Sequence, residues 1–352
     1  MKSLTMKKRA LNRLLRVRAN EVKTRQMPKR YLEKKRWSHA RDKVTSSYAG
    51  YRDKLRERAR QLRLSPLNQR RFQALCGFRP MGGQLRHSDI PARRKFARLV
   101  AREIHRLYLN DPELKFMFLT LLADEGITSD RRPVCYVEQL RDKARRAMMA
   151  LGVDGISAIE ITPLMNFPQK GRGRSLLLHV HMLIWYNPKQ HEPKPVHDLW
   201  PERGYCAWSC RFGADPIRVT VITPEMGTPG YWAAYMLKGA HEAKNRVPRT
   251  RTLGTVGDYK LMSTIEGYRP ELAMRLQEFS SQVPLTAMSL GTKGGAIILR
   301  RCRKQLSRWA KSRTYLYPDA TKKFDEAAFW ERSHRFRRKK HRRFFILGPT
   351  ID

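Results

Sequence analysis

The chain has 352 residues, enough to bury a core in one large domain or two smaller ones. Its 73 Lys and Arg residues against 31 Asp and Glu give a formal net charge of +42, which favours a polyanionic partner, nucleic acid first and an acidic membrane surface second. No apolar run reaches the ~18 residues of a membrane span, and no apolar segment follows the basic N-terminus, so we expect neither a membrane anchor nor a secretory signal.

The positive charge is concentrated at the two ends of the chain. Residues 1–75 hold 24 basic and 5 acidic residues, and residues 300–345 hold 17 and 4. We expect a basic helical N-terminal region over residues 1–85, with too few apolar residues at helical spacing to form a core, and a basic C-terminal tail over residues 300–352. A solvated or disordered tail is the alternative for the N-terminal region.

The middle of the chain, residues 86–245, has the pattern of a folded domain. A helix begins at Ser88 or Asp89, with Pro91 in its first turn and apolar residues at helical spacing after it. A buried strand follows at residues 115–124, and a helix at residues 133–151.

Three further strands and a helix complete the domain. The strands are expected at residues 155–163, 176–186 and 215–223, and the helix begins near Thr228. The loop between the first two of these strands is short enough for a hairpin. The order predicts an α+β fold with a central, largely antiparallel sheet and helices on one face.

Residues 246–299 are less informative. Residues 268–283 have the pattern of an amphipathic helix, and residues 291–300 read as a glycine turn leading into a strand. This region either extends the preceding domain or forms a small accessory one.

The strand "LLLHVHMLIWY", residues 176–186, carries His179 and His181 one residue apart. Side chains at positions i and i+2 of a strand point to the same face, with Cα atoms about 6–7 Å apart, so the two imidazoles can bind one ion. Glu160 lies on the neighbouring predicted strand and can complete a Glu/His/His set if the strands pair. The alternatives are hydrogen-bonded core histidines and a surface carboxylate.

The segment "GYWAAYMLKGA" places three reactive side chains on one helix face. Tyr231 and Tyr235 are four residues apart, and Lys238 is three beyond Tyr235. A tyrosine hydroxyl can act as a covalent nucleophile, and a neighbouring lysine can stabilise negative charge. Aromatic residues at this spacing are also common in helices that only pack against a core.

Together, "FLTLLAD", "HVH" on a strand and the tyrosine helix with its lysine resemble, in this order, the three motifs of the HUH endonuclease superfamily. The closest resemblance is to the two-tyrosine rolling-circle replication initiators of single-stranded DNA phages and plasmids. It spans roughly residues 115–240, about a third of the chain. It implies an HUH nuclease domain with a ferredoxin-like or RRM-like fold over residues 86–245.

The resemblance also implies a mechanism and partners. His179, His181 and Glu160 would hold Mg²⁺ or Mn²⁺, and Tyr235 or Tyr231 would attack a DNA phosphate to give a 5′-phosphotyrosyl link and a free 3′-OH primer, aided by Lys238. The substrate would be a single-stranded, nicked or supercoiled DNA origin. A host DNA polymerase would extend the primer, and a host helicase is expected because the chain has no GxxxxGK[ST] phosphate loop.

Two other functions remain open. A single-strand transposase or a relaxase would use the same chemistry, and a non-catalytic nucleic-acid-binding protein would need only the charge. Aromatic residues among the basic ones can stack on unpaired bases or pack in a core. They are Trp37, Tyr48, Tyr51, Trp309, Phe336 and Phe344.

The five cysteines are scattered, which favours a reducing cytoplasm over a disulfide framework. Cys206 and Cys210, with His191 or His197 upstream, form a loose candidate zinc set. A packed loop is the alternative for this segment.

Overall fold

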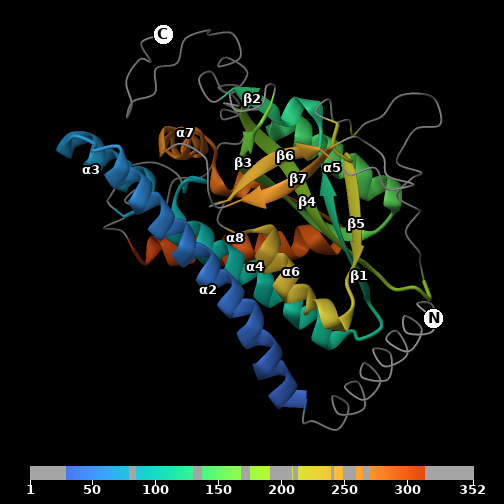
Figure 1. Cartoon of the computed structure of the whole chain (residues 1–352). Coiled ribbons are helices and arrows are strands. Elements are labelled where there is room, and N and C mark those ends of the chain that lie inside the picture. The colour runs from blue at the N-terminus through green and yellow to red at the C-terminus, as the bar shows by residue number, and fades with distance from the viewer. Residues whose placement is uncertain are drawn as a thin grey trace, which may run out of the picture.

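A computed structural model gives the fold. It describes residues 29–78, 85–129, 137–167, 175–190, 208, 213–238, 242–248, 259–264 and 270–313. These residues form an α+β fold in which helices pack on a curled, mixed sheet (Figure 1). Within these ranges no helix combines the length and the apolar character needed to cross a bilayer.

The sheet has eight strands, six of them in the order β5-β1-β4-β3-β6-β7, with β2 paired to β4 and β8 paired to β3. The strands are β1 (Lys115–Leu121), β2 (Ile127–Ser129), β3 (Asp154–Met165), β4 (Ser175–Tyr186), β5 (Ile217–Val221), β6 (Ala243–Pro248), β7 (Tyr259–Thr264) and β8 (Ser289–Thr292). Every pairing is antiparallel except that of β3 with β6. The predicted α+β class and the largely antiparallel sheet are confirmed.

The helices are α2 (Lys29–Gln61), α3 (Pro66–Leu75), α4 (Ile90–Asn110), α5 (Val137–Leu151), α6 (Pro229–Met236), α7 (Pro270–Ser280) and α8 (Gly294–Lys311). Short 3₁₀ turns cover Asp124–Gly126, Pro224–Met226 and Leu285–Met288. The helix α4 starts as predicted, because the Asp89 side chain accepts a hydrogen bond from the Ala92 backbone N–H at 2.8 Å and Pro91 lies in the first turn.

The β3–β4 hairpin forms the centre of the sheet. Its register places Glu160 opposite His179 and Ala158 opposite His181, and on the other side of β4 it places Thr120 of β1 opposite His181. Nearly every residue of both strands is buried, which means that both faces of the sheet are covered at this point. The predicted hairpin is therefore confirmed, and it sets the position of the histidines.

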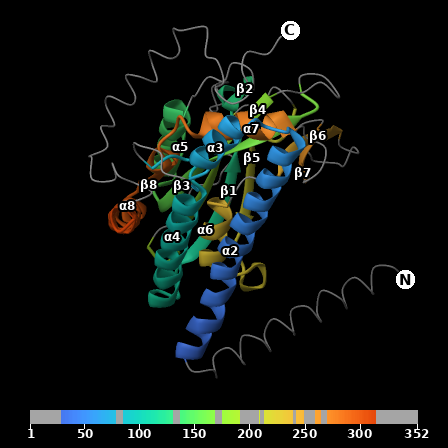
Figure 2. The same ribbon diagram turned by 90° about the vertical axis from the view of Figure 1, so that its left-hand side faces the viewer.

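Helices cover both faces of the sheet, so the expectation of helices on one face is wrong (Figures 1 and 2). Phe118 of β1 packs against Trp232 of α6, on the same face as the histidines. On the opposite face, a Cβ atom placed on Gly155 would lie 3.1 Å from the Met148 sulfur of α5. The helix α5 connects β2 to β3, which both pair antiparallel with β4 and therefore run parallel to each other. This crossover places α5 on the back of the sheet, a position that periodicity does not encode.

The N-terminal region contributes to the core, contrary to our expectation of too few apolar residues. The helix α2 packs against α4 and α6. It does so through a narrow stripe of buried residues: Ala40, Val44, Tyr48, Tyr51 and Leu55. Tyr48 and Tyr51 are each 2% exposed, which supports packing rather than base stacking for these two rings. Trp37 and Trp309 pack partly buried against the core, whereas Phe336 and Phe344 lie outside the described residues.

The C-terminal part differs from the prediction at one element. The amphipathic helix is present as α7, but residues 294–311 form the helix α8 instead of a strand. Gly295 allows α8 to touch the sheet, because a Cβ there would lie 1.8 Å from the Gly155 carbonyl oxygen. Residues 300–311 are thus packed helix rather than tail, residues 312–313 form a turn, and the rest of the predicted tail lies outside the described residues.

Candidate metal centre and adjoining tyrosine helix

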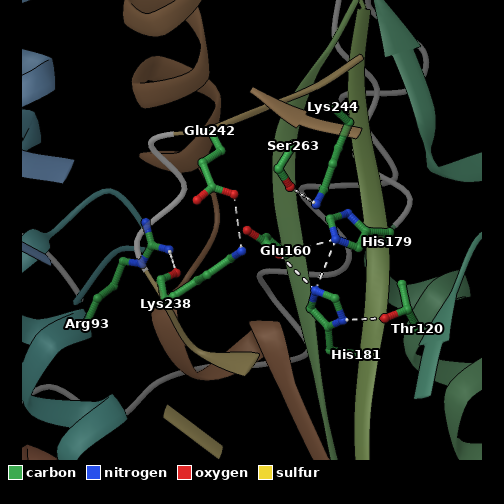
Figure 3. Close-up of polar contacts among 9 residues, drawn as sticks. All are labelled: Arg93, Thr120, Glu160, His179, His181, Lys238, Glu242, Lys244 and Ser263. Atoms are coloured by element: carbon green, nitrogen blue, oxygen red, sulfur yellow. Dashed lines mark hydrogen bonds and ion pairs between the residues drawn. The ribbon is translucent and has the colours of Figure 1, made fainter. Parts of the chain in front are cut away.

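Glu160, His179 and His181 converge on one point of the sheet, on the face that α6 covers (Figure 3). The Glu160 Oε2 atom lies 2.8 Å from His181 Nε2 and 3.2 Å from His179 Nε2, and the two Nε2 atoms are 3.1 Å apart. All three side chains are buried, none more than 4% exposed. The predicted set is therefore assembled by strand register alone.

These three distances fit a divalent ion. Two ligand atoms at right angles, each about 2.1 Å from an ion, are about 3.0 Å apart. Mutual distances of 2.8, 3.1 and 3.2 Å thus match one triangular face of an octahedron. Three adjacent coordination positions would remain for water or substrate oxygens. Two imidazoles and a carboxylate are a donor set used by several divalent metals.

Thr120 orients one of the two imidazoles. Its hydroxyl lies 3.1 Å from His181 Nδ1, so the opposite nitrogen, Nε2, points at Glu160. Such contacts to the second ring nitrogen fix the orientation of a metal-binding histidine. The sequence analysis missed Thr120, although the strand order places it directly beside the histidine strand.

The charge state of the cluster suits metal binding. Burial lowers the pKa of His181 to about 4 and also lowers the pKa of His179, and Glu160 offsets this only in part. Burial alone would raise the pKa of Glu160, but the Lys238 charge and the hydrogen bonds from the two histidines hold it well below its usual range. At neutral pH the site therefore presents neutral imidazoles and a carboxylate, the forms that bind metals.

The tyrosine helix α6 is held at both ends. Thr228 caps its start, with its side chain 3.3 Å from the Tyr231 backbone N–H. The helix ends at Met236, earlier than predicted, so Lys238 follows the helix instead of lying on its face. Beyond the end, the Tyr48 hydroxyl donates to the Leu237 carbonyl, and Arg93 donates to the Lys238 carbonyl at 3.1 Å.

Tyr235 lies beside the cluster. Its ring centroid is 6.0 Å from that of His181 and 5.7 Å from that of Phe118. The Lys238 ammonium lies 4.2 Å from the centroid of the Tyr235 ring. Although α6 ends earlier than predicted, Tyr235 still lies beside His181, and Lys238 still lies beside Tyr235.

Lys238 carries its charge in a buried position. It is 6% exposed and forms an ion pair with Glu242 at 3.6 Å (Figure 3). Burial tends to lower the pKa of Lys238, but Glu160, Tyr235 and Glu242 together raise it above its usual value. A fixed cation therefore stands beside both the cluster and the Tyr235 ring.

Tyr231 is one turn earlier and contacts α2. Its ring stacks on His39, with centroids 4.8 Å apart and planes at 18°. The Lys43 ammonium of α2 lies 5.4 Å from the Tyr231 ring centroid and 5.7 Å from that of Tyr235. No sequence signal identified His39 or Lys43, because their place depends on how α2 crosses α6.

Lys244 is a second missed cation near the histidines. It lies on β6, opposite Leu164 of β3, and its ammonium donates to the Ser263 hydroxyl at 2.9 Å. Its charge contributes to the lowered pKa of His179. With Lys238 it surrounds the cluster with positive charge (Figure 3).

The comparisons with known proteins give no relative. No protein-family model, curated protein or solved structure matches the chain. Within the described part of the chain, Glu160, His179 and His181 form the one group of His, Cys, Asp and Glu side chains that could hold a metal ion. The residues of the candidate zinc set, Cys206, Cys210, His191 and His197, lie outside that part.

Proposed function

We propose that this chain is a metal-dependent tyrosine nuclease that cleaves and rejoins DNA in the manner of two-tyrosine rolling-circle replication initiators. The observation that carries the proposal is Tyr235, whose ring lies 6.0 Å from His181 in a buried Glu/His/His cluster, with a buried cation 4.2 Å from its centroid. The formal charge of +42 supports a polyanionic substrate.

In the proposed phosphoryl transfer, the Glu/His/His cluster holds the metal ion and Tyr235 is the nucleophile. A divalent ion bound by Glu160, His179 and His181 would polarise the scissile phosphate. The phenol oxygen of Tyr235 attacks phosphorus and loses its proton to solvent, the bond from phosphorus to the 3′ oxygen breaks, and that oxygen takes up a proton to become a 3′-OH. One phosphoester replaces another, so the 5′ end stays linked to Tyr235 without an external energy source.

Lys238 supports this step electrostatically. The phenol gains negative charge as its proton leaves, and the Lys238 ammonium, fixed beside the ring, stabilises that charge. Its burial and its ion pair with Glu242 hold it in place before the reaction begins. Pre-positioned charge of this kind requires little rearrangement during the transfer.

Tyr231 supplies a second nucleophile on the same helix. It would attack the junction of a newly copied strand while Tyr235 still carries the first 5′ end. The released 3′-OH would then attack the Tyr235 phosphodiester and close a circle. Lys43, placed between the two rings, provides a cation that both tyrosines can use. A host polymerase and a helicase would act on the opened origin.

The donor set favours Mn²⁺ over Mg²⁺ for the ion. Mg²⁺ prefers oxygen ligands, whereas imidazole nitrogen suits the first-row transition metals better. Two of the three ligands here are imidazoles. We therefore expect activity in both ions, with a lower concentration requirement for Mn²⁺.

The test is a covalent adduct on a denaturing gel. Purified protein, Mn²⁺ and labelled single-stranded DNA from the protein's own origin region are combined, with Tyr235→Phe, Tyr231→Phe, the double variant and His181→Ala. Tyr108→Phe is the matched control, since Tyr108 is a partly buried tyrosine on α4, outside the cluster. We expect an adduct with wild type and the control, and none with the double variant or His181→Ala.

Two results would refute the proposal. An adduct that persists in the double tyrosine variant would place the nucleophile elsewhere. Absence of any adduct with origin DNA would favour a nucleic-acid-binding protein without catalysis. Digestion of the adduct with end-specific exonucleases tests the polarity, because a 5′-phosphotyrosyl link blocks digestion from the 5′ end only.

A further inference from the structure

A groove of about 240 Å³ lies between α2 and α3, and its lining residues include none of the Glu/His/His cluster. We refer to it as the α2–α3 groove. Its apolar wall contains Leu55, Phe72 and Phe78, and α2 contributes Arg52, Arg56 and Arg60. The arginines recur every fourth residue, so they project from one side of the helix.

The two helices form a hairpin that fixes the groove. Arg63 adopts a left-handed backbone conformation, with φ of 46°, at the end of α2. Ser65 then caps α3 by accepting a hydrogen bond from the Asn68 backbone N–H at 3.4 Å, and Pro66 occupies the first turn. Leu55 and Phe72 are buried and join the main core, so the apolar wall is anchored.

The groove combines positive charge with an accessible aromatic ring. The Arg56 guanidinium lies 5.5 Å from the centroid of the Phe78 ring, which is only partly buried. No acidic side chain is among the described residues that line the groove. Arg52 and Arg60 pair with Asp53 and Glu57, but both carboxylates are exposed outside it.

We infer that the α2–α3 groove binds one nucleotide of single-stranded DNA. Aromatic rings bind unpaired bases by stacking, and arginines bind the phosphates on either side of a stacked base. Gln69 at the edge provides an amide that can donate to and accept from a base edge. The volume is below the ~300–1,000 Å³ of pockets for drug-sized ligands, which suits a single base with its sugar.

The groove is separate from the cleavage site. Arg56 is 13 residues beyond Lys43 on the same helix, about 20 Å at 1.5 Å per residue, and projects from the other flank of the buried stripe. Binding there requires neither the metal cluster nor the tyrosines. The inference therefore goes beyond the proposed function, and it would stand if the chain proved not to cleave DNA.

The test measures binding without chemistry. Fluorescein-labelled oligothymidylate and a matched strand of abasic sugars are titrated by anisotropy in EDTA, using the Tyr231→Phe, Tyr235→Phe double variant as the parent. Three further substitutions are each made separately in this parent: Phe78→Leu, Arg56→Gln and, as the matched control, Lys54→Gln. Lys54 is exposed on α2 and does not line the groove, so its substitution removes one charge elsewhere on the same helix.

We expect the parent to bind the base-bearing strand about tenfold more tightly than the abasic strand. Phe78→Leu should reduce the ratio of these two affinities to about one. Arg56→Gln should weaken binding of both strands and lower the slope of log affinity against log salt by about 0.7. Lys54→Gln should keep the base preference. Equal binding of both strands by the parent, or a preference unchanged by Phe78→Leu, would overturn the inference.

A second measurement needs no substitution. Ultraviolet crosslinking of a bromodeoxyuridine strand to the unaltered chain, followed by peptide mapping, should mark the segment of residues 66–78. Crosslinks confined to other segments would refute the groove as the binding site. Full competition by free thymidine monophosphate at the same base concentration would refute a strand as its ligand.

Discussion

Replacing Lys238 by Met tests the electrostatic role assigned to the buried cation. Its ammonium lies 4.2 Å from the centroid of the Tyr235 ring. The negative charge develops on the phenol oxygen of the same ring, and two unit charges about 4 Å apart, with an effective dielectric constant of ~20, interact by about 4 kcal/mol. This is an upper limit, since only part of the charge develops in the transition state. A loss of about 2–3 kcal/mol corresponds to a rate lower by about 10²-fold.

The assay is single-turnover adduct formation in Mn²⁺, followed from pH 6 to pH 10. The pKa of Lys238 is raised above its usual value, so the wild type keeps this cation across the whole range. The Lys238→Met deficit should therefore persist across the whole range. Lys238→Arg should retain most of the activity, because it keeps the charge.

Lys244→Met is the matched control, because Lys244 is a second, partly buried cation near the histidines, and its ammonium donates to Ser263 rather than lying over the Tyr235 ring. Its deficit should be smaller, and it should narrow as the pH rises, because burial lowers the pKa of Lys244. A Lys238→Met rate within threefold of wild type, or a pH profile parallel to that of Lys244→Met, would refute the assigned role.

Three other predictions concern metal binding and stability. Mn²⁺ at 100 times its dissociation constant should stabilise the folded chain by about 2.7 kcal/mol, which a higher melting temperature would show. His181→Ala should abolish this rise in melting temperature. An equal rise in that variant would contradict metal binding by the Glu/His/His cluster. Burial holds the pKa of His87 well below its usual value. Below about pH 6.5 the unfolded chain therefore binds a proton at this histidine that the folded state does not, so the free energy of unfolding should decrease as the pH falls. Urea midpoints at pH 7 and pH 5 test this, and His87→Asn should fall less between them. Gly295→Ala should lower the free energy of unfolding by about 3 kcal/mol, because the new Cβ would meet a backbone carbonyl. Gly294→Ala should lower it less, because there the Cβ would meet the Asp154 carboxylate, which can move. Equal decreases in urea unfolding would argue against the close contact at Gly295.

The sequence was sufficient to predict the Glu/His/His cluster because the cluster depends on short-range rules. A strand places alternate residues on one face, which puts His179 and His181 together. In a hairpin, the strand register alone decides whether Glu160 joins them, and in the structure Glu160 pairs directly with His179. The helix start at Asp89 was predictable for the same reason, since a cap and a first-turn proline are local signals.

The errors occurred where tertiary contacts decide the outcome. The side of the sheet on which α5 lies depends on the chain path between strands, and no residue pattern records it. The segment that begins at Gly294 was read as a strand because glycines preceded a run of apolar residues. In the structure Gly295 allows close packing, and the buried Ile298, Cys302 and Leu306 follow a helical spacing that extends beyond residues 291–300.

The helix α2 shows why composition alone misjudged the N-terminal region. The helix is strongly polar on average, yet a narrow stripe of buried residues is enough, because α2 packs against both α4 and α6. That packing gives the basic residues on its flanks a fixed position. Lys43 faces the two tyrosines on one flank, and Arg56 lines the α2–α3 groove on the other. One helix that reads as a charged extension thus connects the tyrosine site to a second surface suited to the same polyanion.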